Sequence, residues 1–80
     1  MAQYTVTITR RGFDDRTVTV RKCLSEAEAR TRAARRLYGP RAYFRSDTVP
    51  HRGQVWRDER NTGSGWSASS ITPVITMRVD

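Results

Sequence analysis

The sequence predicts an α+β fold in which a single antiparallel β-sheet carries one helix on one face. Three features of the 80-residue chain support this fold class. Two N-terminal stretches alternate polar and apolar residues, the next stretch has the start and stop signals of a helix, and three further strand-like stretches follow. The predicted element order is therefore β-β-α-β-β-β, within one small basic domain that spans residues 1–80.

The first two predicted strands form an antiparallel hairpin. Residues 3–10 place an apolar side chain at every second position and mostly threonines between them. Residues 16–22 repeat this pattern with Val18 and Val20, and the intervening RGFDD supplies turn-forming residues. Because the side chains of a strand alternate between the two faces of a sheet, each strand has one apolar face to bury.

Residues 24–40 (LSEAEARTRAARRLYGP) predict the helix. Ser25 is a favourable N-cap residue, and Glu28 stands three positions later, as a capping box requires. Gly39 and Pro40 end the helical pattern. At 100° per residue, a narrow and alanine-rich stripe is expected to face the sheet. It comprises Ala27, Thr31, Ala34 and Tyr38, with Leu37 at its edge.

The chain after the helix returns to strand patterns. Residues 41–48 predict a short strand, and residues 53–60 predict a fourth strand whose charged end makes it an edge or a solvent-projecting arm. Residues 61–70 are small and polar and predict a flexible loop. The last strand is expected within residues 71–80, where apolar and polar residues alternate again.

The chain is strongly basic. Fourteen arginines and one lysine against eight acidic residues give a formal net charge of +7. A charge of this size favours polyanionic partners, which include nucleic acid, an acidic protein face and anionic lipid. The preference for arginine fits bidentate contacts with phosphate or carboxylate. The codon usage of a GC-rich genome explains the same preference equally well.

Arginines in and after the helix form the first candidate binding surface. Arg32, Arg35 and Arg36 fall within about 100° of arc on the side away from the alanine stripe. The alternative is an ordinary solvated helix face, in which Glu28 pairs with Arg32. The hairpin arginines would extend the basic surface if the hairpin turn lies beside the end of the helix. The predicted contact residues are Arg10, Arg11, Arg32, Arg35, Arg36, Arg41 and Arg45.

Aromatic residues near these arginines form a second candidate surface. Tyr43 faces outward if Ala42 and Phe44 face the core. Exposed Tyr43, Trp56 or Trp66 would offer stacking surfaces to single-stranded bases, whereas in most small domains such side chains belong to the core. Trp66 lies in GSGWSASS, where a tryptophan either folds back as a lid or meets a partner, so it is the strongest single candidate.

The sequence offers little for catalysis, and we expect a non-enzymatic protein without a cofactor. His51 and Cys23 are the only histidine and cysteine, which are too few soft ligands for a metal site. Asp58 and Glu59 are adjacent, so in a strand they point to opposite faces and cannot act as a carboxylate pair. A ribonuclease that combines His51 with arginines is the enzymatic alternative. The single cysteine suits a reducing cytoplasm, and no stretch reaches the roughly 20 apolar residues of a membrane span.

From Leu24 to Trp66 the layout resembles that of small phage-encoded anti-CRISPR proteins directed at type I surveillance complexes. LSEAEARTRAA opens a helix after a strand pair, a glycine break leads to the short strand AYFRSD, and GQVWRDER gives a glycine-hydrophobic-tryptophan strand. The strand at 71–79 and the longer loop before it depart from that layout. The resemblance implies a non-enzymatic inhibitor in the host cytoplasm that sits on the backbone subunits of a crRNA-guided complex and keeps target DNA from pairing or docking. It assigns no role to an individual residue.

These observations leave two hypotheses of different kinds. In the preferred one, the protein is an inhibitor or regulator that binds a nucleoprotein complex through its arginine-rich face. In the alternative, it is a regulatory module that binds DNA or RNA directly. Asp58 and Glu59 interrupt the basic surface on the fourth strand, which favours a protein partner over an unbroken phosphate track.

Overall fold

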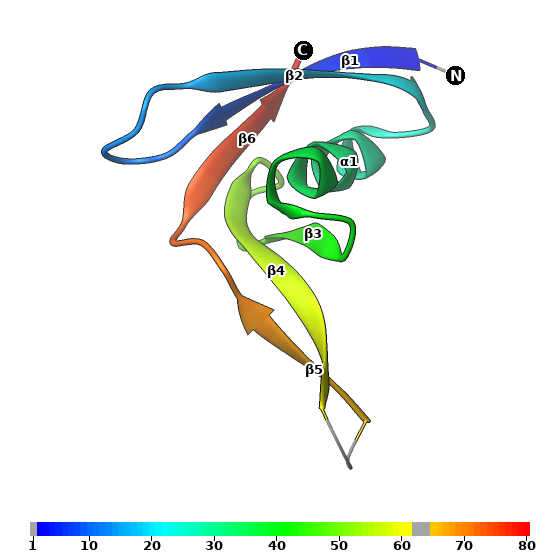
Figure 1. Ribbon diagram of the computed structural model, residues 1–80. Helices are drawn as coiled ribbons and strands as arrows, with labels where there is room; N and C mark the ends of the chain where they lie inside the picture. The colour runs from blue at the N-terminus through cyan, green and yellow to red at the C-terminus, as the bar shows by residue number, and fades with distance from the viewer. Residues whose placement is uncertain (1, 62–64) are drawn as a thin grey trace.

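Six β-strands and one helix make up the computed structural model, which describes residues 2–61 and 65–80 (Figure 1). The predicted fold class is confirmed, because the strands form one antiparallel sheet and the helix packs against it. In chain order the elements are β1 (Ala2–Thr9), β2 (Arg16–Cys23), α1 (Glu26–Tyr38), β3 (Ala42–Ser46), β4 (Arg52–Asn61), β5 (Gly65–Ser70) and β6 (Ile75–Val79).

The strands follow the order β2-β1-β6-β4-β3, so the C-terminal strand β6 lies in the middle of the sheet. β4 is the longest strand and has three partners. It pairs with β6 through Arg52 and Gly53, and with β5 through Trp56–Asn61. β3 pairs with the opposite edge of β4. β2 and β3 are therefore the outer strands of the main sheet.

β5 corrects the prediction of a flexible loop over residues 61–70. The pairing of β5 with β4 uses backbone hydrogen bonds, which small polar residues form as readily as apolar ones, so the sequence carries no apolar alternation there. β3 ends its pairing at Arg57, and beyond this residue β4 and β5 continue as a two-stranded ribbon away from the rest of the molecule (Figure 1). The sequence predicts a solvent-projecting arm at the charged end of residues 53–60, and the β4 part of this ribbon is such an arm.

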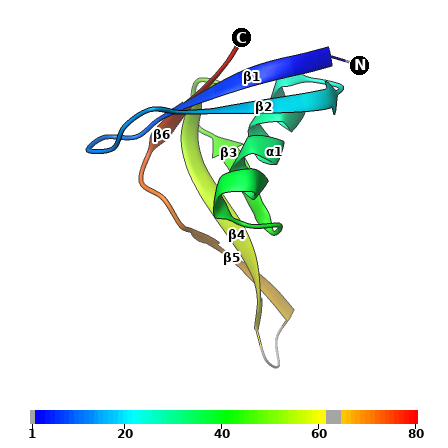
Figure 2. The same cartoon turned by 45° about the horizontal axis from the view of Figure 1, so that its top comes forward.

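The sheet curves around α1. Figures 1 and 2 show β1 and β2 on one side of the helix and β3 and β4 on the other. α1 contacts both outer strands, β2 and β3, as well as β1 and β6. The helix therefore fills the gap between the two edges of an open, strongly curved sheet. This helix, the one within the described residues, is neither long nor apolar enough to cross a membrane.

The core lies between α1 and the concave face of the sheet. The inward positions of the hairpin are Val6, Ile8, Val18 and Val20, and all four are buried, as the alternation predicts. β4 and β6 add larger apolar side chains, while the helix adds alanines that let its backbone approach the sheet. These further core residues are Ala29, Ala33, Ala34, Ala42, Val55, Ile75 and Met77, together with Cys23.

The buried face of α1 differs from the predicted stripe. Ala34 is buried as predicted, but Ala27 is exposed. The buried face comprises Ala29, Arg30, Ala33 and Ala34, which is a rotation of roughly 100° at 100° per residue. Arg30 causes the difference, because a pattern of apolar residues does not place an arginine in the core. Its Nε donates a hydrogen bond to the Met77 carbonyl at 2.8 Å, and its Nη2 lies 3.7 Å from the Glu26 carboxylate.

The helix begins and ends where the sequence predicts. The Ser25 hydroxyl accepts a hydrogen bond from the Glu28 N–H at 3.2 Å, and the Glu28 carboxylate accepts one from the Leu24 N–H at 3.0 Å. Gly39 follows the last turn with φ of 112°, a conformation that favours glycine, and its N–H donates to the Arg35 carbonyl. These caps fix the orientation of the arginines along α1.

Candidate functional site

A groove of about 830 Å³ lies between α1 and the outer strand β2. The helix side is formed by the side chains of Arg32, Arg35 and Arg36, the three arginines that the sequence places on one arc. We call this hollow the arginine groove. Its full lining is Thr19, Val20, Arg21, Arg32, Arg35, Arg36 and Pro40.

Two of the three arginines are tied to the open edge of β2. Arg36 Nη1 donates a hydrogen bond to the Thr19 carbonyl at 3.0 Å. Arg32 Nη1 donates to the Arg21 carbonyl and lies 3.2 Å from Cys23 Sγ. The match follows from geometry, because four helix residues advance about 6 Å and two strand residues advance about 6.6 Å. Residues four apart on α1 therefore meet carbonyls two apart on β2.

These bonds give Arg32 and Arg36 a structural role that the sequence does not reveal. An outer strand exposes unpaired carbonyls, and the two guanidinium groups satisfy those of Thr19 and Arg21. Each bond uses Nη1 alone, whereas a guanidinium carries five N–H donors. Donors on both side chains are thus left for an anion in the groove, and the anchored geometry holds them in place.

The positive charge of the groove is not neutralised within the described residues. Their ion pairs join Arg30 to Glu26 and Arg52 to Asp47, and neither involves a groove arginine. Arg35 is exposed on the side of α1 that faces away from the core. An ordinary solvated helix face would pair Glu28 with Arg32. The described residues form no such ion pair, and Glu28 instead accepts a hydrogen bond in the helix cap.

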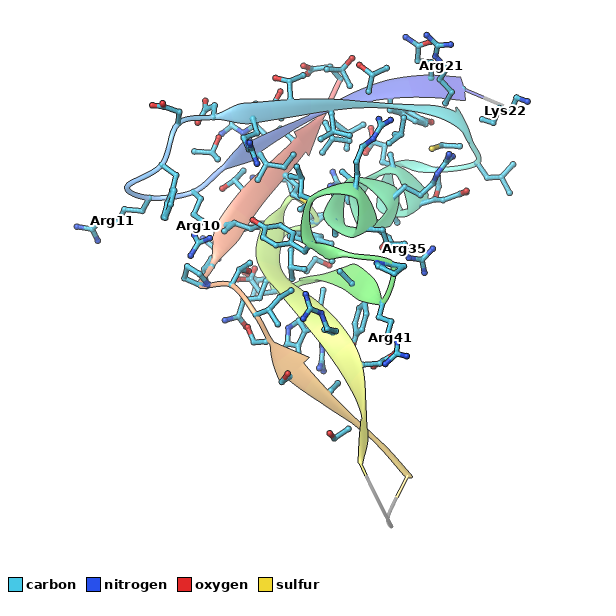
Figure 3. All side chains as sticks on the ribbon, in the orientation of Figure 1. Arg10, Arg11, Arg21, Lys22, Arg35 and Arg41 are labelled. Atoms are coloured by element: carbon cyan, nitrogen blue, oxygen red, sulfur yellow. The ribbon has the colours of Figure 1, made fainter. Side chains whose placement is uncertain are left out.

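Arg21 lines the groove, whereas Arg41 and Arg45 lie outside it. Arg21 contributes its backbone carbonyl, while its side chain points away from α1 (Figure 3). Arg41 is exposed just before β3, on the same side of the view as Arg35 (Figure 3). Arg45 is on β3, with its guanidinium carbon 5.1 Å from the centre of the Trp56 ring. The structure therefore does not gather all the predicted arginines into one surface.

Arg10 and Arg11 lie at the hairpin turn, on the opposite side of the view from Arg35 and Arg41 (Figure 3). The turn lies beside the C-terminal end of α1, where it helps to line a second hollow of about 460 Å³. Two carboxylates interrupt the positive charge there, and Arg10 stacks on Phe13 at 4.4 Å. This hollow is lined by Ile8, Arg10, Phe13, Asp14, Asp15, Arg16, Leu37 and Tyr38.

The aromatic residues divide between the core and the outer surface. Tyr38 and Phe44 pack against the core. Tyr43 and Trp56 are only partly buried and lie on the opposite face of the sheet from Phe44. The prediction that Tyr43 faces outward is therefore confirmed. The side chain of Trp66, the strongest single candidate from the sequence, lies outside the described part of the structure, so its role stays a prediction.

Comparison of the chain with protein-family models, with curated proteins and with solved structures gave no match. The resemblance to anti-CRISPR proteins therefore stays a prediction. The case for a function rests on the arginine groove, which three arginines of one helix line and in which none of them forms an ion pair with a carboxylate of the described residues.

Proposed function

We propose that the protein is a non-enzymatic binding protein whose arginine groove contacts the phosphates of a nucleic acid. The observation that supports this proposal most is the arrangement of Arg32, Arg35 and Arg36 along one hollow. Guanidinium groups bind phosphate oxygens through short, charge-assisted and often bidentate hydrogen bonds. The net charge of +7 adds long-range attraction toward a polyanion.

The anchoring of Arg32 and Arg36 strengthens the proposal. A free arginine side chain loses rotamer freedom when it binds a ligand, and this loss weakens binding. Here the β2 carbonyls already restrict two of the side chains, so part of that loss has occurred on folding. The groove is thus a partly preorganised anion site rather than a set of mobile surface charges.

The dependence of binding on salt tests the proposal directly. Three phosphate contacts predict a log–log slope of affinity against salt near −3 for duplex DNA and near −2 for a single strand. Fluorescence anisotropy with labelled DNA and RNA, beginning at about 50–100 mM salt, measures this slope. Absence of binding to every nucleic acid in that range, or a slope near zero, contradicts the proposal.

Arg35→Ala locates the contact, because Arg35 makes no bond to β2 that its removal would break. We expect weaker binding to all sequences and a salt slope reduced by about one. Arg11→Ala is the matched control, since it removes one exposed positive charge on the opposite side of the view in Figure 3. Equal losses in both variants would mean that net charge, and not the groove, drives binding.

The groove also fits the preferred hypothesis from the sequence, in which the nucleic acid is part of a nucleoprotein complex. A type I CRISPR surveillance complex is the candidate that the resemblance supplies. Affinity purification from a host lysate, with and without nuclease, tests this form of the proposal. We expect the wild-type chain to recover a nucleoprotein assembly and Arg35→Glu to recover less of it. Recovery of no such assembly would leave direct binding to free nucleic acid as the function.

A further inference from the structure

The face of the sheet opposite α1 carries an aromatic pair on β3 and β4. Tyr43 and Trp56 are cross-strand partners in the register of these strands. Their neighbours Phe44 and Val55 pack into or against the core, so the alternation of a strand turns Tyr43 and Trp56 to the outer face. Both aromatic side chains are partly exposed and neither belongs to the core cluster.

A cation and an amide stand next to the aromatic pair. Arg45 is exposed, two residues after Tyr43 on the same face, and its guanidinium carbon lies 5.1 Å from the centre of the Trp56 ring. Gln54 is the cross-strand partner of Arg45, and its Nε2 donates to the Thr72 carbonyl at 3.4 Å, so its amide oxygen is the atom that can accept a hydrogen bond from a base. Arg45, Gln54 and Trp56 line a small hollow of about 140 Å³. We call Tyr43, Arg45, Gln54 and Trp56 the aromatic platform.

This combination matches the chemistry of an unpaired nucleotide. A base presents a flat π-face for stacking on an aromatic ring or a guanidinium plane, and edge groups that an amide recognises through hydrogen bonds. The adjacent phosphate needs a cation, which Arg45 supplies. In a duplex the π-faces of the bases are covered by their neighbours, so only a single strand can use such a platform.

The acidic residues near the platform limit its extent. Asp47 lines the same hollow, but its carboxylate is paired with Arg52 at 3.2 Å. Asp58 follows Trp56 by two residues on β4 and is exposed, so its charge opposes a phosphate farther along the ribbon. The favourable part of the outer face is therefore the segment from Tyr43 to Arg45 and the strand opposite it.

We propose that the aromatic platform binds single-stranded nucleic acid by stacking its bases on Tyr43 and Trp56. This inference rests on the proposed function, since it names the form of nucleic acid that the protein prefers. The arginine groove contacts phosphates, so its contribution to affinity does not depend on the base or on whether the nucleic acid is single- or double-stranded. The platform contacts require an exposed base. The two surfaces thus make separable contributions to binding.

An abasic oligonucleotide separates these contributions, because it keeps the phosphates and lacks the bases. The probes are oligo(dT) of about 16 nucleotides, near the upper site size of small single-strand-binding folds, its abasic equivalent and a duplex of the same length. We expect wild type to bind oligo(dT) about 5- to 150-fold more tightly than the abasic strand for each stacked base. Tyr43→Leu should lose the part of this preference that one stacked base contributes, because Trp56 remains. Tyr43→Phe should keep the full preference, since phenylalanine retains the ring.

The outcomes distinguish the platform from the groove. Arg35→Ala should weaken oligo(dT) and abasic binding by the same factor. Equal affinity of wild type for the two strands overturns the platform and leaves the groove intact. Binding to the duplex alone also overturns the platform and leaves the groove intact, whereas binding to none of the three probes overturns both proposals. A cross-strand aromatic pair can also stabilise a sheet, so thermal unfolding of Tyr43→Leu and Tyr43→Phe shows whether the variants fold.

Tryptophan fluorescence keeps the test decisive if Tyr43→Leu does not fold. The chain has two tryptophans, Trp56 and Trp66, so Trp66→Phe leaves Trp56 as the reporter. We expect oligo(dT) to quench Trp56 emission in this variant and the abasic strand to leave it unchanged, because quenching needs a stacked base. Bound oligo(dT) without a change in Trp56 emission overturns the platform.

Discussion

Gly53 shows most directly how a single residue determines the local geometry of the sheet. It pairs with Ser46 on β3 and with Ile75 on β6, so backbone surrounds it on both sides. A Cβ atom at this position would lie 2.0 Å from the Arg45 carbonyl oxygen and 2.7 Å from the Ser46 Cα. Both obstacles are backbone atoms, which cannot rotate away as a side chain can.

We therefore expect Gly53→Ala to lower the free energy of unfolding by about 3–5 kcal/mol, within the range of the most damaging single substitutions. Gly12→Ala is the control. Its Cβ would meet no atom within 4 Å, and only the positive φ of 86° opposes it, which costs about 1–2 kcal/mol. Urea denaturation measures both variants. Similar losses would show that the close approach of β3 and β4 at Gly53 relaxes at little cost.

Asp47 makes the turn between β3 and β4 sensitive to acid. Loss of hydration pushes the pKa of its carboxyl up, but hydrogen bonds from the Val49 N–H and the Arg52 guanidinium pull it down, and the net pKa lies below the usual 3.8. A carboxyl whose folded-state pKa is depressed stabilises the fold above its unfolded pKa. This stabilisation is lost as pH falls through the folded-state value.

Asp47→Asn should therefore reduce stability at neutral pH and flatten the loss of stability below about pH 4. Thermal unfolding across a pH series measures both effects. Asp58→Asn, which alters an exposed carboxylate on the ribbon, serves as the control. An unchanged acid profile in Asp47→Asn would mean that the hydrogen bonds of this turn contribute nothing to folding.

At the scale of elements, the contact between α1 and β2 protects an outer strand. The open carbonyls of Thr19 and Arg21 would otherwise be available to a strand of another molecule. Arg32 and Arg36 occupy these carbonyls and bring positive charge to the edge, which disfavours pairing between like-charged copies. The same two side chains therefore shape the arginine groove and cover carbonyls through which the edge of β2 could pair with another strand.

The double variant Arg32→Ala/Arg36→Ala tests this protection. We expect a loss of about 0.5–1.5 kcal/mol of stability for each hydrogen bond, together with self-association that increases with protein concentration. Light scattering and gel filtration detect the association. Arg11→Ala/Arg35→Ala removes the same charge without uncovering β2 and should stay at the wild-type size. Association of both variants to the same extent would assign the effect to charge.

The elements themselves were predictable to the extent that they depend on local patterns. The hairpin alternation and the Ser25 cap are read from neighbouring residues, and both appear in the structure. β5 was missed because its pairing depends on the backbone of β4 rather than on its own apolar residues. The roles of Arg32 and Arg36 were missed because a sequence does not show which carbonyls of a sheet remain open.

At the scale of the whole molecule, the predicted basic surface is divided. Arg32, Arg35 and Arg36 line the groove, Arg45 lies on the aromatic platform, and Arg10 lies at the hairpin turn with Asp14 and Asp15. Spacing along the chain could group the helix arginines, since four residues make about one turn. Spacing could not show that Arg10 and Arg45 lie apart from the helix arginines, because their positions depend on how far the sheet curves around α1.

The central position of β6 has a consequence for how the chain matures. β1, β2 and α1 are contiguous in sequence, as are β3, β4 and β5, yet the two groups meet in the sheet only through β6. Of all the strands, β6 leaves the ribosome last, and it must insert between two neighbours that are already synthesised. Until β6 pairs, the folding chain therefore holds two half-sheets with unpaired inner edges, and we expect this partly folded state to be the one most prone to aggregation.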